Sequence, residues 1–338
     1  MLEDIKIKPL LDTLRLENIS DQMYFSEKYA DYVSNSRLTK INPDQDGSPE
    51  KYFEKTPFEN NDSFVFGSII HGLVLQPDSY LLVDTVNRPT AKAGMMADEL
   101  YVPGKTPTDE EIIAASDKVD YYKGKMNENR ISDLRGKCNQ YWRDRAIWEQ
   151  NHKDETREVF YYDEKGREKI KGVLKAVSKY QSFQNLLHPE GVLETPDSQN
   201  EQTILMDVQC EVENKEPFIL RLKSKLDNFT IDKETGIITV NDLKTTSKPV
   251  AWFASAFKKY HYYRELGMYG YLLTQCARKF YNIEKPQLKA NCLVVETFEP
   301  FTTEVFMLNK KDISKGINEF RALLRLVAYY TANGYGTK

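Results

Sequence analysis

Two segments between residues 220 and 246 carry charged side chains at the spacing of β-strands. The first ends in Lys225-Leu226-Asp227, and the second contains Asp242-Leu243-Lys244 followed by two threonines. Side chains alternate faces along a strand, so Asp242 and Lys244 project to the same side. If the strands pair, two carboxylates and one ammonium converge at the end of a sheet. Carboxylates bind Mg²⁺ and a lysine can orient a water, so this trio suits metal-assisted phosphodiester cleavage.

The upstream strand separates apolar residues from charged ones. One face would carry leucines, and the other would carry Arg221, Lys223, Lys225 and Asp227. Charged side chains are rarely buried without partners, so we expect this second face to line something polar. Residues 232–236, Asp-Lys-Glu-Thr-Gly, are typical of a turn and predict a hairpin. The Asp-x-Lys pair alone decides little, because it occurs by chance in most chains of this length.

Composition limits the class of protein. The chain has 338 residues, 29% of them charged, with a formal net charge of −4. This length allows one large domain or two modest ones with room for a core. The net negative charge does not indicate a nucleic-acid partner, because binding nucleic acid would require a local groove lined by basic residues. The 21 tyrosines could stack on bases, although most tyrosines serve core edges and surfaces.

The cysteines are widely spaced and form no Cys-x-x-Cys pair. They are Cys138, Cys210, Cys276 and Cys292. This spacing argues against a zinc ribbon or an iron–sulfur cluster. The sequence shows no signal-peptide pattern and no long apolar run. We therefore expect reduced thiols in a cytoplasmic protein without a membrane partner.

Helical patterns surround the charged strands. An apolar helix over residues 63–75 contains His71, and a lone histidine in such a helix is more often a core residue than a ligand. Residues 104–158 have charged helical spacing, either on the outside of the core or as an inserted arm. Thr108 and Glu111 fit a capping box there. Residues 10–42 mix helical and turn patterns.

A helix over about residues 251–280 follows the Asp-x-Lys strand. Glu265 and Tyr269 lie four residues apart on one face, and Tyr262 precedes Glu265 by three. Positive charge comes from Lys258, Lys259 and Arg264. Such a stripe could hold a strand of nucleic acid. An ordinary amphipathic helix with tyrosines at its core edge explains the segment equally well. Strand pattern over residues 288–308 and a helix over about 312–330 complete the chain.

Together these segments resemble the PD-(D/E)XK nuclease superfamily, and within it the RecE-like (exonuclease VIII) and RecB-like branch of phage and bacterial recombination nucleases. The family's motifs occur in order as Gly67-Ser68-Ile69-Ile70-His71, Glu201, Asp227, Asp242-Leu243-Lys244-Thr245-Thr246 and Glu265-Leu266-Gly267-Met268-Tyr269. Each motif is weak alone, but five in the family's order form a strong pattern over about residues 20–305.

Two positions depart from the family's pattern. Leu226 stands where the family has a proline, a position that tolerates much variation. Glu265 stands where it has a glutamine. A carboxylate cannot donate hydrogen bonds as an amide does, which weakens the expected DNA contact at Glu265.

The resemblance implies an α/β fold, a mixed central β-sheet flanked by helices as in restriction endonucleases, with N-terminal and inserted helical segments. We expect an N-terminal helical and loop segment over residues 1–60 and a nuclease core over 61–310. The helical insertion would span about residues 104–158, and a C-terminal helix and tail would span 311–338.

The resemblance also implies site residues. The expected metal ligands are His71, Glu201, Asp227, Asp242 and the carbonyl of Leu243. The catalytic residues would be Asp227, Asp242, Glu201 and Lys244, with Lys244 orienting or deprotonating the attacking water. The cofactor would be Mg²⁺, for which Mn²⁺ could substitute. The expected DNA contacts are Arg221, Lys223, Lys225, Tyr262, Arg264, Glu265 and Tyr269.

The implied function is a Mg²⁺-dependent exonuclease that resects linear duplex DNA in phage or prophage recombination, by two-metal hydrolysis in the cytoplasm of a bacterial host. Relatives in this branch form rings, so an oligomer of three or four chains is expected, with a single-strand annealing protein as a further partner. An endonuclease and a catalytically idle DNA-binding module of the same fold stay open. The intact trio of Asp227, Asp242 and Lys244 favours an active enzyme.

Overall fold

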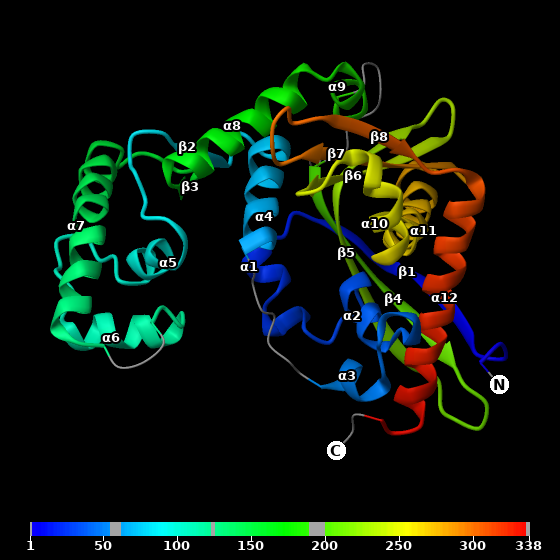
Figure 1. Cartoon of the computed structure of the whole chain (residues 1–338). Helices are drawn as coiled ribbons and strands as arrows, with labels where there is room; N and C mark the ends of the chain where they lie inside the picture. Colours follow the sequence, from blue (N-terminus) through cyan, green and yellow to red (C-terminus); the bar gives the residue numbers. More distant parts are fainter. Residues whose placement is uncertain (1, 55–61, 123–125, 189–199, 336–338) are drawn as a thin grey trace. The chain divides into compact units, whose positions relative to one another are not determined.

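The structure, a computed structural model, describes residues 2–54, 62–122, 126–188 and 200–335, and its elements are labelled in Figure 1. It divides into two units. The first contains the chain up to Gly67 and from Ala176 onward, and the second contains Ser68–Lys175. Each unit has apolar clusters of its own, so each can be understood from its own residues.

The first unit is built on a six-stranded sheet with the strand order β1-β4-β5-β6-β7-β8. The strands are β1 (Lys6–Glu17), β4 (Asn200–Glu211), β5 (Phe218–Asp232), β6 (Ile237–Thr246), β7 (Gln287–Glu296) and β8 (Thr303–Met307). Strands β6 and β7 pair in parallel, and the other neighbours in this sheet pair antiparallel. The predicted mixed sheet of an α/β fold, flanked by helices, is therefore confirmed.

Strands β5 and β6 form the hairpin that the turn residues predict. The carboxylate of Asp232 accepts hydrogen bonds from the backbone N–H groups of Glu234 (3.0 Å) and Thr235 (3.1 Å). Gly236 has a φ of 70°, which glycine adopts at little cost. The turn thereby fixes the register in which Asn228 pairs with Asn241.

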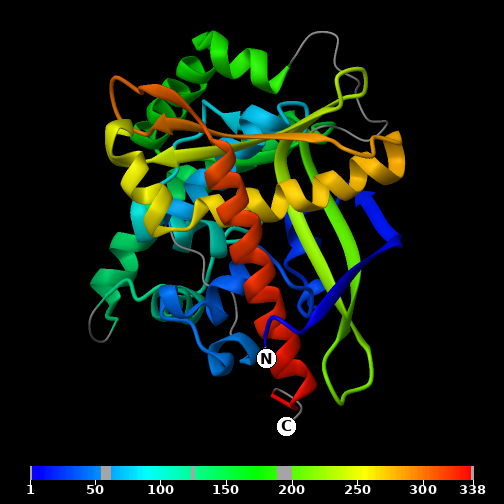
Figure 2. The ribbon, with the colours of Figure 1, turned by 90° about the vertical axis from the view of Figure 1, so that its right-hand side faces the viewer.

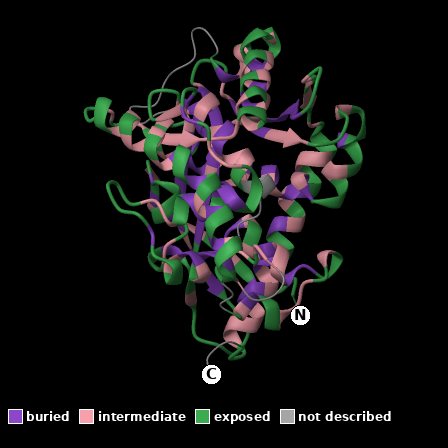
Figure 3. Cartoon of the chain, turned by 60° about the vertical axis from the view of Figure 1, so that its left-hand side comes forward, coloured by how far each residue is buried: buried purple, intermediate pink, exposed green. Residues whose placement is uncertain are grey.

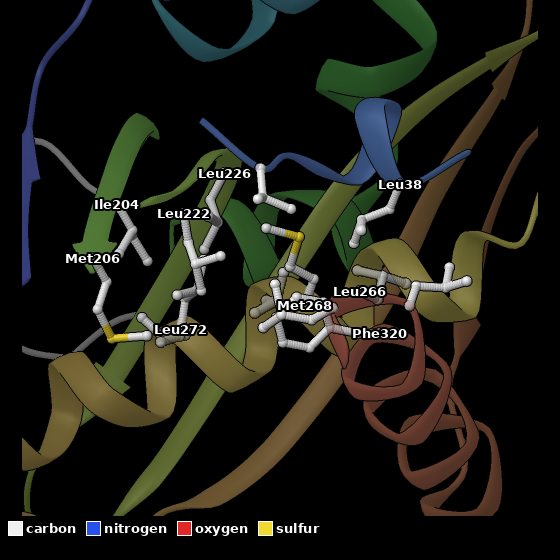
Figure 4. Packing of buried hydrophobic residues seen from close by; sticks show 14 of the residues in the cluster. Leu38, Ile204, Met206, Leu222, Leu226, Leu266, Met268, Leu272 and Phe320 are labelled. Carbon is white, nitrogen blue, oxygen red and sulfur yellow. The ribbon is translucent and has the colours of Figure 1, made fainter. Parts of the chain in front are cut away.

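Helix α11 (Tyr262–Tyr281) packs across the sheet, and α12 (Lys310–Ala332) packs against α11, as Figure 2 shows. The core between them includes Leu222, Leu226, Leu266, Met268, Leu272 and Phe320, which Figure 4 labels. The two helices approach closely at glycines, since a Cβ on Gly267 would lie 2.4 Å from the backbone carbon of Gly316. This crossing fixes the part of α11 that faces the end of β6.

The remaining elements of the first unit are short. They are α1 (Asp21–Tyr24), η1 (Glu27–Tyr29), α2 (Asn35–Ile41), η2 (Pro43–Gln45), α3 (Pro49–Phe53), α9 (Gln181–Leu187), η3 (Val250–Trp252) and α10 (Phe253–Lys259). Two sequence interpretations need correction here. Residues 10–17 belong to edge strand β1 and not to a helical pattern. The expected single helix over 251–280 is divided into η3, α10 and α11, with a break where His261 has a φ of 55°.

The second unit is mainly helical. It holds most of α4 (Asp62–Leu75), then β2 (Tyr80–Val83), α5 (Ala91–Glu99), α6 (Asp109–Lys118), α7 (Glu128–Asn151), β3 (Glu158–Tyr161) and the larger part of α8 (Glu164–Lys179). The predicted capping box of Thr108 and Glu111 begins α6. Strands β2 and β3 form a small parallel sheet. Exposed helix faces appear green in Figure 3.

Two properties of the described chain bear on its class. The four cysteines are buried free thiols, in agreement with the sequence interpretation. Among the helices of the described residues, none combines the length and the apolar character that crossing a bilayer requires.

Candidate functional site

Three carboxylates lie next to one another on neighbouring strands of the large sheet. The strand pairs on either side of Glu201 show that it lies opposite Asp227 in the register of β4 against β5. On the other side of β5, the β5–β6 register leads to Asp242, and the Leu243 N–H donates to Asp227 Oδ2 at 2.7 Å. Carboxyl oxygens of Glu201 and Asp227 lie within 4.8 Å of each other. We call Glu201, Asp227 and Asp242 the carboxylate row.

The backbone at Glu201 is unusual. This residue has a φ of 54°, in the left-handed region that residues with a Cβ rarely adopt, and only 8% of it is exposed. Its Oε2 lies 3.1 Å from Lys225 Nζ, which also contacts Asp21 Oδ1 at 2.5 Å. Burial lowers the pKa of Lys225, but the two carboxylates outweigh it and raise that pKa overall. Lys225 is therefore a partner of the carboxylate row.

Lys244 lies between two carboxylates. Its Nζ is 2.9 Å from Asp242 Oδ1 and 3.3 Å from Glu265 Oε2. The Tyr269 hydroxyl donates to Glu265 Oε1 at 3.1 Å, and the Tyr262 ring centroid lies 4.9 Å from Lys244 Nζ. Of the helix residues predicted to touch DNA, Tyr262 and Glu265 thus contact the lysine, and Tyr269 is connected to it through Glu265. Glu265, the departure from the family's glutamine, gives Lys244 a second anionic partner.

The cluster carries an excess of negative charge. Burial raises the pKa of Asp242, and the nearby carboxylates of Glu265 and Asp227 raise it further, while Lys244 opposes this shift. Burial lowers the pKa of Lys244, but Asp242, Glu265 and Asp227 together raise it well above the usual lysine range. The carboxylates around this lysine thus outnumber its single positive charge, which is the situation that a bound cation relieves.

The donor set fits a hard divalent cation. Within the described residues, Asp242 Oδ2 is buried and has no hydrogen-bond partner, although buried carboxylate oxygens are normally bonded. Ions such as Mg²⁺ and Ca²⁺ hold oxygens at about 2.0–2.6 Å, so one ion can bridge oxygens separated by up to about twice that distance. Glu201 and Asp227 meet this condition. The carbonyl of Leu243 stays a predicted ligand.

His71 belongs to the second unit, so its predicted place among the ligands stays a prediction. It is half-buried on α4. The start of α4 belongs to the first unit, where a Cβ on Gly67 would lie 3.6 Å from Thr245 Oγ1 at the end of β6. Residues four apart share one side of a helix, so His71 lies on the same side of α4 as Gly67.

Two of the predicted DNA contacts are wrong because their side chains are buried. Arg264 is 0% exposed, and its guanidinium is bonded to Asn35, Thr39, Gln45 and Glu319. Lys223 is 6% exposed and donates to the Tyr24 carbonyl at 2.6 Å. The charged face of β5 was expected to line a polar space. At Lys223 it is covered instead by the N-terminal segment, where the Lys223 N–H bonds the Val33 carbonyl at 2.9 Å.

Other basic and aromatic side chains of the first unit are exposed. Arg221, Lys258 and Lys259 are exposed. Trp252, which the sequence analysis did not select, is 61% exposed on η3. Its neighbour Phe253 stacks on Tyr262 at a centroid distance of 5.7 Å and an interplanar angle of 17°, which connects Trp252 to the surroundings of Lys244. The only sequence signal was a tryptophan shortly after the Asp-x-Lys strand.

Comparisons with known proteins add little to this geometry. No family model matches the chain, and no curated protein matches it. Among solved structures, the chain is similar to a protein from Eubacterium rectale named as a candidate exonuclease, with 10% identity and a TM-score of 0.34. The alignment covers 82% of this chain and 88% of the other.

Proposed function

We propose that the protein is a divalent-metal-dependent nuclease that hydrolyses DNA phosphodiester bonds at the carboxylate row. The observation that carries the proposal is the buried Asp242 Oδ2, which has no partner among the described residues although Lys244 and further carboxylates lie beside it. If this position had only a structural role, an amide or a hydroxyl could stand there without a buried charge. A buried carboxylate with a bare oxygen is suited to a cation.

Each residue has a distinct task in this proposal. Glu201, Asp227 and Asp242 would hold the metal, with the Leu243 carbonyl and His71 as further ligands. When bound, Mg²⁺ or Mn²⁺ lowers the pKa of a water and neutralises charge on the phosphate. Lys244, held between Asp242 and Glu265, is an ammonium because these carboxylates raise its pKa, so it would orient the attacking water by donating a hydrogen bond to it. It could accept that water's proton only where a bound cation lowers its pKa. Asp242 takes part in both tasks, because its Oδ1 contacts Lys244 and its Oδ2 has no hydrogen-bond partner among the described residues.

The DNA would reach the row over exposed residues. With Arg264 and Lys223 excluded by burial, Arg221, Lys258 and Lys259 remain for phosphates, and Trp252 is available to stack on a base. The finer proposals rest on the family resemblance alone. They are digestion from the ends of linear duplex DNA, a ring of three or four chains, a single-strand annealing partner and a role in phage recombination within a bacterial cytoplasm.

The test compares linear plasmid with covalently closed plasmid, with Mg²⁺, Mn²⁺, Ca²⁺ or EDTA present. We expect Mg²⁺ and Mn²⁺ to support digestion of the linear form from its ends, and EDTA to abolish it. Asp242→Asn should lower the rate at least about a hundredfold, because the site loses a charged ligand. Full activity of Asp242→Asn would overturn the proposed site.

Two further outcomes separate the related functions. Rapid cutting of closed circles would identify an endonuclease. DNA binding that falls steeply with salt, without cleavage under any metal, would identify a binding module. Light scattering on the same samples measures the mass of the active particle. A monomer that digests long tracts in a single binding event would exclude the ring.

A further inference from the structure

Four asparagines form a hydrogen-bonded row across β4, β5, β6 and β7. Asn200 pairs in register with Asn228, Asn228 with Asn241, and Asn241 with Asn291. The Nδ2 of Asn228 donates to Asn200 Oδ1 at 2.8 Å, that of Asn241 to Asn228 Oδ1 at 2.7 Å, and that of Asn291 to Asn241 Oδ1 at 2.8 Å. We call these residues the asparagine ladder.

The inner amides of the ladder use both of their N–H groups. Asn241 Nδ2 also donates to the Leu186 carbonyl at 3.0 Å, and Asn228 Nδ2 to the Leu187 carbonyl at 3.4 Å, both at the end of α9. Carbonyl oxygens can only accept, so these contacts determine which end of each amide is the nitrogen. The ladder is thus directional and anchored.

Because its amides are buried, the ladder contributes little net free energy to the stability of the fold. Asn228 is 0% exposed, Asn241 1% and Asn291 5%. Moving amides out of water costs free energy that their hydrogen bonds only partly return, whereas apolar side chains at the same positions gain from burial. A fully bonded chain of amides is instead rigid, because each bond restricts the next. The ladder therefore gives the sheet a fixed geometry at this level.

The ladder lies one peptide bond from the carboxylate row. Asn200 precedes Glu201, Asn228 follows Asp227, and Asn241 precedes Asp242. The backbone is irregular at this level, since Glu201 has a φ of 54° and the Leu243 N–H donates to the Asp227 side chain. Regular strand pairing alone therefore does not fix the carboxylates. The adjacent amides supply lateral bonds where the backbone is irregular.

We propose that the asparagine ladder positions the metal-binding carboxylates. It sets the spacing and register of β4, β5 and β6, so that Asp227 can share a cation with Glu201 on one side and face Asp242 on the other. Metal–oxygen distances tolerate changes of only about 0.2 Å, and a one-residue slip would turn a strand's side chains to the wrong face. This inference rests on the proposed function. The ladder asparagines are positioning residues, since they hold the ligands' strands and not the ion.

Calorimetric titration with Mn²⁺ tests the inference, with Asn241→Ala as the variant and Val240→Ala as the matched control. Val240 is on the same strand and 0% exposed, so its truncation also costs stability but leaves the ladder intact. Well below both melting temperatures, we expect Asn241→Ala to weaken Mn²⁺ binding about ten- to a hundredfold, the scale found for residues that orient ligands. Val240→Ala should bind like the wild type. Wild-type affinity in a folded Asn241→Ala would overturn the ladder's role.

A second variant keeps the test decisive if Asn241→Ala does not fold. Asn291→Ala removes the terminal donor of the ladder and leaves the contacts to α9 in place. We expect it to weaken Mn²⁺ binding about threefold, within the range of indirect coupling energies, and an unchanged affinity would refute the inference. Absence of Mn²⁺ binding in the wild type would refute the proposed function and the ladder's role together. Binding that no ladder variant changes would refute the ladder's role alone.

Discussion

Two clusters of buried charge lie along α11 and differ in how completely their hydrogen bonds are made. In the first, every guanidinium nitrogen of Arg264 has an acceptor, on Asn35, Thr39, Gln45 or Glu319. In the second, Lys244 contacts two carboxylates, yet Asp242 Oδ2 has no partner among the described residues. We call these the Arg264 cluster and the Lys244 cluster.

The electrostatics of the two clusters differ in the same sense. Burial lowers the pKa of Arg264, and the carboxylates of Glu319 and Glu265 oppose that shift, but of the two only Glu319 bonds this permanent cation. Around Lys244, burial and neighbouring carboxylates raise the pKa of Asp242. A cluster that completes its own bonds and charge stabilises the fold. A cluster that leaves an oxygen and net charge unmatched keeps the capacity to bind a cation.

The largest expected effect is on catalysis at Lys244. Lys244→Ala should lower the single-turnover rate by roughly two to four orders of magnitude, the scale of lost general acid–base assistance. The DNA affinity of this variant should stay near that of the wild type. The control is Lys248→Ala, which changes an exposed lysine and should also leave DNA affinity near the wild-type value. Single-turnover kinetics and a filter-binding titration measure the two quantities. A collapse of DNA affinity with an unchanged rate would make Lys244 a phosphate clamp.

Truncation in the Arg264 cluster should act on stability. Arg264→Ala leaves Glu319 without its cation and removes bonds to three further side chains, so we expect a loss of about 3–5 kcal/mol in the free energy of unfolding. Asp242→Asn should instead leave stability equal or higher, because it removes a buried charge. Urea denaturation of both variants decides. Equal losses in the two would contradict the distinction between the clusters.

The sequence predicted what depends on short-range pattern. The β5–β6 hairpin follows from alternation and from Asp232 and Gly236, and the same alternation places Asp242 beside Lys244. The burial of Arg264 was not predictable in this way, because its partners Asn35 and Glu319 are distant in sequence.

The site was predictable only in part for the same reason. In the sequence, a glutamate in place of a glutamine only weakened the expected DNA contact of Glu265, and its contact with Lys244 could be seen only in the structure. The asparagine next to each acidic residue of the row is visible in the sequence. Its role depends on strand register, which arises from the whole sheet.

A charge change at Glu265 should shift the pH dependence of the Lys244 cluster. Glu265 is among the carboxylates that raise the pKa of Lys244, so Glu265→Gln should lower that pKa. If a neutral Lys244 activates the water, the rising limb of the pH–rate profile moves toward lower pH, and the effect is smaller than that of Lys244→Ala. Single-turnover rates between pH 6 and about 10 measure it. Tyr269→Phe, which keeps the carboxylate, is the control and should not move the limb. A shift toward higher pH would exclude Lys244 as the base.

The smallest expected effect concerns Lys223, a buried cation whose bonded partner is a carbonyl. Burial and the charge of Arg37 lower its pKa from 10.5 to about 8. Between these values the unfolded chain binds a proton that the folded chain lacks, so this group's contribution to stability rises with pH through that window. At neutral pH the buried charge costs about 2–3 kcal/mol, which Lys223→Met should recover in part, less the lost bond to Tyr24. Urea denaturation at pH 7 and at about pH 10 should show the variant's advantage shrinking as pH rises.

Lys225→Met is the matched control from the same strand. Since carboxylates raise the pKa of Lys225, its loss should destabilise the protein at pH 7. An advantage of Lys223→Met that stays constant across this range would refute the depressed pKa, and would leave Lys223 as a cation satisfied by the Tyr24 carbonyl and ring.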